Sequence, residues 1–169
     1  TQVGGDTLQI EVNIMPGKGE LLLTGQLGDV MKESAQAGIS YIRSVADQYK
    51  IDPEFFQKHD MHVHIPEGAV PKDGPSAGIT MATAMMSAII EKSVRADLAM
   101  TGEITLRGRV LPIGGLKEKL LAAKYAKIKE VLVPEKNRPD IEEMDKEIIQ
   151  GLNIQFVDNM KEVLGEALA

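Results

Sequence analysis

The sequence contains no cysteine and no tryptophan, and aromatic residues make up only 4% of its 169 residues. The lack of cysteine excludes disulfide bonds, thiolate metal sites and cysteine nucleophiles. No apolar run approaches the roughly 20 residues that a membrane-spanning helix needs, and the first residues show no signal-peptide pattern. We therefore expect a soluble, cytoplasmic protein that has no membrane partner.

Basic residues are too few for a surface that binds nucleic acid. The chain has 19 Lys and Arg against 25 Asp and Glu, a formal net charge of −6. This charge has the wrong sign for neutralising phosphates along a groove, which argues against nucleic acid as a partner. Because no internal repeat or long linker divides the chain, we predict one domain over residues 1–169.

Strand-like and helix-like periodicities alternate along the chain. Apolar residues alternate over 8–14, and a turn at 16–19 leads to a second short strand at 20–24, so we expect a hairpin. Apolar residues three and four apart predict a long amphipathic helix over 29–49. The further predicted strands cover 61–65, 98–106, 109–113, 130–133 and 153–157, and the further predicted helices cover 76–92, 116–127, 139–150 and 160–168. This order predicts an α+β (mixed α/β) fold with helices packed on sheets.

A serine stands at the start of the most apolar predicted helix. Residues 71–78 read PKDGPSAG, in which Ser76 follows a loop rich in proline and glycine. Unpaired N–H groups and the positive dipole end of a helix start favour an oxyanion formed beside such a serine. The backbone N–H groups of Gly74 to Ser76 are the candidates for that role. A serine here can also simply cap the helix, so its position alone leaves both roles open.

The order of residues limits which base could activate this serine. Residues 74–78 match the Gly-x-Ser-x-Gly elbow of α/β-hydrolases, but that family has its histidine after the serine. All three histidines of this chain come before it, so the elbow interpretation fails. A catalytic set of His62 or His64 with Asp73 and Ser76 stays open. A metal site at the two histidines lacks an identified third ligand, and none is predicted.

A lysine that is partly removed from water can replace histidine as the base. At about 100° per residue, one apolar stripe of the predicted helix over 116–127 is formed by Leu116, Leu120, Ala123 and Ala126. Lys119 falls within this stripe, whereas Lys117 points about 160° away from Lys119. The periodicity therefore selects Lys119 as the inward lysine. The structural alternative is that Lys119 buries its stem and keeps its ammonium group in water.

Three segments of the chain resemble the proteolytic domain of the bacterial Lon protease family. They are residues 71–78, residues 100–108 (MTGEITLRG) and residues 111–119 (LPIGGLKEK). The similarity continues in order and spacing over nearly the whole chain. It implies the Lon proteolytic-domain fold, which is related to the ribosomal protein S5 domain 2-like βαβ architecture.

The resemblance implies roles for seven residues. It implies a Ser-Lys dyad in which Ser76 is the nucleophile and Lys119 is the general base. It also implies that Thr101 orients the lysine and that Asp73 lies in the loop close to the serine. The positions that match a supporting polar network of the family are Glu11, His62 and His64.

The resemblance further implies a serine endopeptidase that works through an acyl-enzyme inside an ATP-dependent machine for protein quality control. Its expected substrates are unfolded or damaged proteins and peptides, and its expected assembly is a homo-hexamer. The chain contains no Gly-x4-Gly-Lys-Ser/Thr phosphate loop. We therefore expect the ATPase domain, with its ATP and Mg, and the N-terminal domain to lie outside this chain, which itself needs no cofactor.

Two other classes of function stay open at this point. One is a noncatalytic assembly scaffold that has the same fold. The other is a serine hydrolase that uses His62 or His64 as its base. Labelling of Ser76 by a serine-directed acylating inhibitor separates the scaffold from the enzymes, and comparison of His→Ala with Lys119→Ala variants separates the two enzymes.

Overall fold

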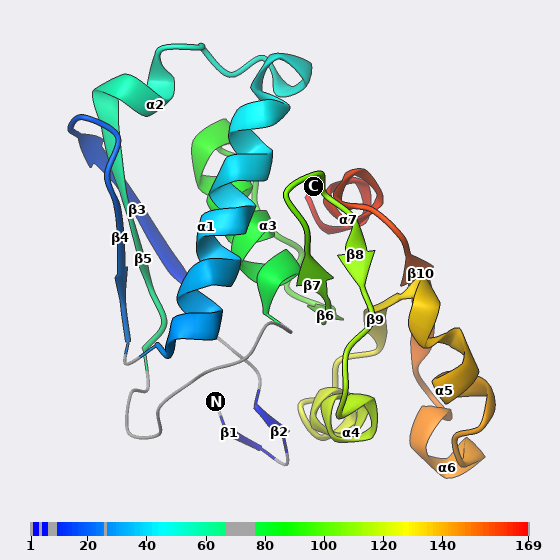
Figure 1. The fold of residues 1–169 in the computed structure, drawn as a ribbon. Coiled ribbons are helices and arrows are strands. Elements are labelled where there is room, and N and C mark those ends of the chain that lie inside the picture. Colours follow the sequence, from blue (N-terminus) through cyan, green and yellow to red (C-terminus); the bar gives the residue numbers. More distant parts are fainter. Residues whose placement is uncertain (1, 4, 7–9, 26, 67–76, 169) are drawn as a thin grey trace.

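The structure of the chain, a computed structural model, describes residues 2–3, 5–6, 10–25, 27–66 and 77–168 (Figure 1). Two short N-terminal strands, β1 (Gln2–Val3) and β2 (Gly5–Asp6), pair antiparallel. The rest combines two three-stranded sheets, a two-stranded ribbon and helices packed against them. This arrangement confirms the predicted mixed α/β class.

The first sheet consists of β3 (Glu11–Pro16), β5 (His59–His64) and β4 (Leu21–Thr24), in that spatial order. β5 pairs antiparallel with β3 and parallel with β4. The predicted hairpin of the two first strands is therefore wrong, because β5 lies between them. β5 buries Met61 and Val63 in the core, and its apolar inner face makes it the natural central strand.

Two helices cover the inner face of this sheet (Figure 1). α1 (Asp29–Ser44) is followed by the 3-10 helix η1 (Ala46–Tyr49), so the predicted helix over 29–49 changes geometry near its end. α3 (Gly78–Ile90) is apolar on nearly all sides and is central, as predicted. The two helices approach closely at Gly38, where an added Cβ would lie 3.0 Å from the Met85 Cε atom. A short helix that the periodicity did not predict, α2 (Phe55–Lys58), precedes β5.

The second sheet is parallel and has the order β10 (Asn153–Val157), β9 (Glu130–Pro134), β6 (Leu98–Met100). The predicted strand over 98–106 is broken, because β6 ends at Met100 and β7 (Glu103–Ile104) pairs with β8 (Val110–Leu111) instead. The break falls at Thr101 and Gly102. An added Cβ at Gly102 would lie 2.8 Å from the Val110 side chain, so the backbone at Gly102 packs closely against Val110.

Helices border this second sheet and ribbon. They are α4 (Leu116–Tyr125), the 3-10 helix η2 (Glu135–Asn137), α5 (Arg138–Glu142), α6 (Lys146–Ile149) and α7 (Met160–Ala167). The predicted helix over 139–150 is thus two short helices. It is interrupted because Asp145 adopts an extended ψ of 138° before α6 starts. Within the described ranges, no helix is long and apolar enough to cross a membrane.

Candidate active site

The first turn of α3 is fastened to the segment that follows β6. The backbone N–H of Ile79 donates to the carbonyl oxygen of Gly102 at 3.1 Å. Gly78 is buried there, and an added Cβ would lie 2.9 Å from the backbone nitrogen of Ile104. The start of the helix that Ser76 precedes in the sequence is therefore held directly against the segment that carries Thr101.

Thr101 is a buried residue at the carboxyl end of β6. Only 3% of it is exposed, and its backbone N–H donates to the carbonyl oxygen of Leu132 on β9 at 3.2 Å. A buried hydroxyl in protein interiors acts as a fixed polar group, because it cannot exchange partners with bulk water. The structure thus places the predicted orienting residue between the start of α3 and the second sheet.

α4 presents the lysine that the periodicity selected. Lys119 is half-buried, whereas Lys117 is exposed. The predicted stripe packs on Val131 and Val133 of β9 through three residues: Leu116, Leu120 and Ala123. Ala126, the fourth predicted member, is exposed because the helix ends at Tyr125. Lys119 is thus less exposed than Lys117, as the periodicity predicts, and Lys124 on the same helix is half-buried as well.

His62 and His64 lie on the outer face of β5, opposite the buried Met61 and Val63. The Thr24 hydroxyl lies 2.8 Å from His62 Nε2 and 2.6 Å from His64 Nδ1. Their ring centroids are 6.3 Å apart. The two histidines therefore form a polar cluster bridged by a threonine that sequence reasoning missed.

Thr24 was missed because the predicted hairpin gave β4 the wrong neighbour. In the observed register, Thr24 and Glu11 flank His64 from the two sides, on β4 and β3. Paired residues of neighbouring strands project to the same face of a sheet. The exposed Glu11 is thus brought to the histidine face.

Asp73, Gly74 and Ser76 lie outside the described residues. The next residue, Ala77, is buried and occupies the N-cap position of α3. Its carbonyl oxygen accepts the N–H of Met81 at 2.9 Å. In the part of the chain that the structure describes, no group of three or more His, Cys, Asp or Glu side chains could hold a metal ion.

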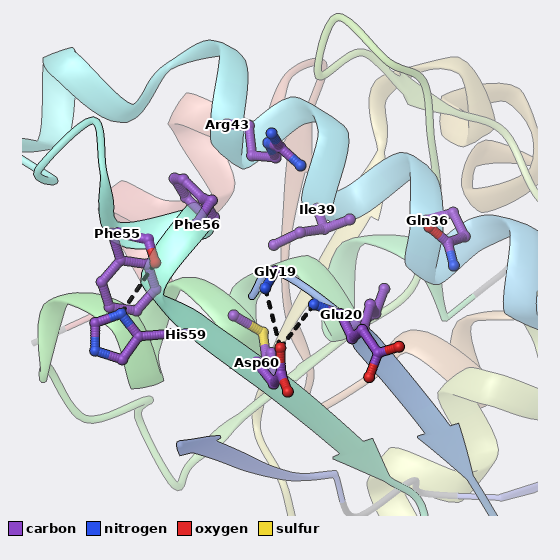
Figure 2. Close-up of a pocket in the computed structure, with 11 residues that line it drawn as sticks. Gly19, Glu20, Gln36, Ile39, Arg43, Phe55, Phe56, His59 and Asp60 are labelled. Atoms are coloured by element: carbon purple, nitrogen blue, oxygen red, sulfur yellow. Dashed lines mark hydrogen bonds between the residues drawn. The ribbon is translucent and has the colours of Figure 1, made fainter. Parts of the chain in front are cut away.

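A pocket of about 140 Å³ lies at the α2 end of the first sheet, between α1, the turn before β4 and the start of β5 (Figure 2). The carboxylate of Asp60 in this pocket holds the turn before β4. Asp60 accepts backbone N–H groups from Lys18, Gly19 and Glu20 at 2.8–3.0 Å, and these contacts lower the pKa of its carboxyl group. The His59 ring stacks on the Phe55 ring, with the two ring centroids 4.3 Å apart. None of the predicted site residues that the structure describes lines this pocket.

Comparison with known proteins gives one consistent result. Residues 1–169 match the family of the Lon protease (S16) C-terminal proteolytic domain. Over 168 residues, which cover 99% of this chain, it is 72% identical to a Lon protease of Lachnoclostridium phytofermentans and 62% identical to Lon protease 2 of Desulfotalea psychrophila. It is 57% identical to Lon protease 1 of Bacillus subtilis over the same length. The chain spans only 21–22% of the length of these curated relatives. The chain therefore belongs to the Lon protease C-terminal proteolytic domain family, a family of peptidases.

Proposed function

We propose that this peptidase domain works through a Ser-Lys dyad, with Ser76 as the nucleophile and Lys119 as the general base. The observation that carries the proposal is that Lys119 on α4 is half-buried, whereas Lys117 is exposed. Partial removal from water disfavours the charged form of an amine, which is what a lysine base requires.

The proposed reaction proceeds in two halves. The neutral Lys119 amine takes the hydroxyl proton of Ser76 while the oxygen attacks the carbonyl carbon of a peptide bond. Backbone N–H groups around Gly74 stabilise the resulting oxyanion, and each well-aimed donor contributes on the order of 3 kcal/mol. The C–N bond then breaks as Lys119 returns the proton to the leaving amine. Water, deprotonated by the same amine, hydrolyses the acyl-enzyme and regenerates both residues.

Thr101 is the proposed orienting partner of the lysine. Its burial at the end of β6 and the attachment of the adjacent Gly102 to α3 support this role. A hydroxyl can accept a hydrogen bond from the amine or donate one to it, so it can serve both protonation states of the base. Asp73, Glu11 and the two histidines are proposed as a supporting polar network and not as the base.

Beyond this domain, we propose that the chain serves an ATP-dependent protease. The relatives are about five times longer than the matched region, which leaves room for the ATPase and N-terminal domains expected from the family. ATP and Mg would be used there, while this domain needs no cofactor. The proposed assembly is a cytoplasmic homo-hexamer that degrades unfolded or damaged proteins.

The dyad is tested by peptide hydrolysis with Ser76→Ala and Lys119→Ala variants. We expect near-equal and almost complete losses, because members of a dyad act as a unit. Lys117→Ala is the matched control on the same helix and should retain activity. Full activity of Lys119→Ala would refute the lysine base. Failure of an active-site acylating inhibitor to label Ser76 in an inactive wild-type chain would favour a noncatalytic scaffold.

The pH dependence of the rate is a second test. Because the base must be deprotonated, hydrolysis should accelerate as the pH rises from about 6 to about 10. The Lys117→Ala control should give the same profile as the wild type. A rate that stays flat over that interval would contradict a lysine base.

A further inference from the structure

A buried asparagine holds the loop through which the chain enters α4. The Oδ1 atom of Asn137, on η2, accepts the backbone N–H of Ile113 at 2.9 Å, and its Nδ2 atom donates to the carbonyl oxygen of Ile113 at 2.9 Å. Asn137 is 2% exposed. One side-chain amide thus pairs with both backbone polar groups of one residue, as a neighbouring strand would do.

The orientation of this amide is determined by its partners. Nδ2 also donates to the Asp140 carboxylate at 2.7 Å. If the amide were flipped, its oxygen would face both the Ile113 carbonyl and the Asp140 carboxylate, and its NH₂ group would face the Ile113 N–H. Only the observed orientation matches donors with acceptors at all three contacts.

We call the pair of hydrogen bonds between Asn137 and Ile113 the Asn137 clamp. The two residues between this clamp and α4 are little packed against the rest of the protein. Gly114 and Gly115 are exposed, and a Cβ added at either position would meet no described atom within 4 Å. Gly115 has a φ of +68°, a conformation that side-chain-bearing residues rarely adopt. The two hydrogen bonds between Asn137 and Ile113 therefore hold this loop with two residues remaining before α4 begins.

The clamp and Thr101 depend on the same strand. β9 ends at Pro134, three residues before Asn137, and its Leu132 carbonyl accepts the Thr101 N–H. The adjacent Val131 and Val133 pack in one cluster with the inner stripe of α4. β9 and η2 together thus set where α4 begins relative to Thr101.

We propose that Asn137 is a positioning residue for the catalytic lysine, acting through Ile113 and the start of α4. This inference rests on the proposed Ser-Lys function. Lys119 lies one helical turn after Leu116, the first residue of α4, so a shift at the helix start is transmitted to its amine. A displacement of about 1 Å of a catalytic group can cost on the order of 100-fold in rate.

The test is Asn137→Asp, which keeps the shape of the side chain but replaces the NH₂ donor with an oxygen. We expect kcat for a short peptide to fall at least about tenfold, KM to change less than about twofold, and the alkaline rise of kcat to shift in pH. The matched control is Val163→Ala in α7, a buried position in the other core cluster. It should lower thermal stability while leaving the shape of the pH profile unchanged.

Two further variants keep the proposal falsifiable. Asp140→Asn in the Asn137→Asp background offers an NH₂ donor to the new carboxylate and should recover part of kcat. If Asn137→Asp does not fold, Asp140→Ala tests the proposal instead, because Asp140 is exposed and its carboxylate accepts from Asn137 Nδ2. We expect its kcat to fall a few-fold and its pH profile to shift. An unchanged kcat and pH profile in the folded variant, while Lys119→Ala is inactive, would overturn the role of Asn137 alone. Activity in Lys119→Ala would instead overturn the dyad.

Discussion

The backbone N–H of Ile79 and the carbonyl oxygen of Gly102 are joined by a 3.1 Å hydrogen bond. This bond links the first turn of α3 to a segment that lies more than 20 residues later in the chain. Because Gly102 directly follows the buried Thr101, the bond fixes the start of α3 relative to Thr101, although the two belong to different elements. Several consequences of this link can be measured.

Gly78→Ala should disturb the contact between α3 and the Thr101 segment. An added Cβ would lie 2.9 Å from the backbone nitrogen and the Cγ2 atom of Ile104, so one of the two segments must move. We expect the free energy of unfolding to fall by about 1–3 kcal/mol and peptide hydrolysis to decrease. Denaturant unfolding and a peptidase assay measure the two effects.

Gly165→Ala is the matched control for this substitution. Gly165 lies within α7, and its added Cβ would meet no described atom within 4 Å. Alanine should therefore stabilise the protein by about 0.5–1 kcal/mol through its higher helix propensity. Equal effects of the two substitutions would contradict the close packing at Gly78.

Leu120→Ala should destabilise the attachment of α4 to β9. The Leu120 side chain is fully buried beside Lys119, whereas Leu121 is 39% exposed. We expect a loss of about 2–5 kcal/mol for Leu120→Ala because it leaves a cavity. Leu121→Ala, one residue further on, should change the stability by no more than about 0.5 kcal/mol. Similar losses in denaturant unfolding would show that α4 does not pack by this stripe.

Thr24→Val should change the protonation pattern of the two histidines. A single hydroxyl hydrogen can serve only one ring nitrogen, so at least one of the nitrogens that face Thr24 carries a proton. Valine keeps the branched shape that suits a strand but removes this bridge. We expect the ring ¹⁵N NMR shifts of His62 and His64 to change. Unchanged shifts in the variant would show that the hydroxyl does not select the tautomers.

Variants of the same two histidines test whether a histidine or Lys119 is the base. If the histidines only support the site, His62→Ala and His64→Ala should reduce peptide hydrolysis less than Lys119→Ala does. The comparison is made on kcat at one pH for all three variants. A histidine variant as inactive as Lys119→Ala would favour the histidine-dependent mechanism.

Asp60→Asn should weaken the protein in a pH-dependent way. The backbone N–H groups of Glu20, Lys18 and Gly19, in that order of effect, hold the pKa of the Asp60 carboxyl below its ordinary value. The stabilisation by the carboxylate is therefore complete above the pKa of the unfolded chain and is lost as the pH falls through the lower folded-state pKa. The melting temperature of the wild type should exceed that of Asp60→Asn at neutral pH, and the gap should close in acid. A gap that is constant with pH would contradict this origin.

Local patterns predicted the parts of the candidate site that depend on one element. The alternation over 61–65 placed His62 and His64 on one face of a strand, and the spacing along α4 selected Lys119. The sequence could not reveal Thr24 or Asn137 as partners, because both act on residues of other elements. Thr24 reaches β5 only when β4 and β5 are neighbours, and Asn137 reaches Ile113 across 24 positions of the chain.

The sequence by itself determined the apolar side of α1, α4 and β5, since the 3.6-residue and two-residue periods are local properties of the chain. Only the tertiary structure decided that β5 separates β3 from β4 and that residues 98–106 divide between two sheets. The reason is that strand partners are chosen by burial and hydrogen bonding between distant segments. Two alternative pairings leave the same local pattern, and packing against α1, α3 and β9 selects between them.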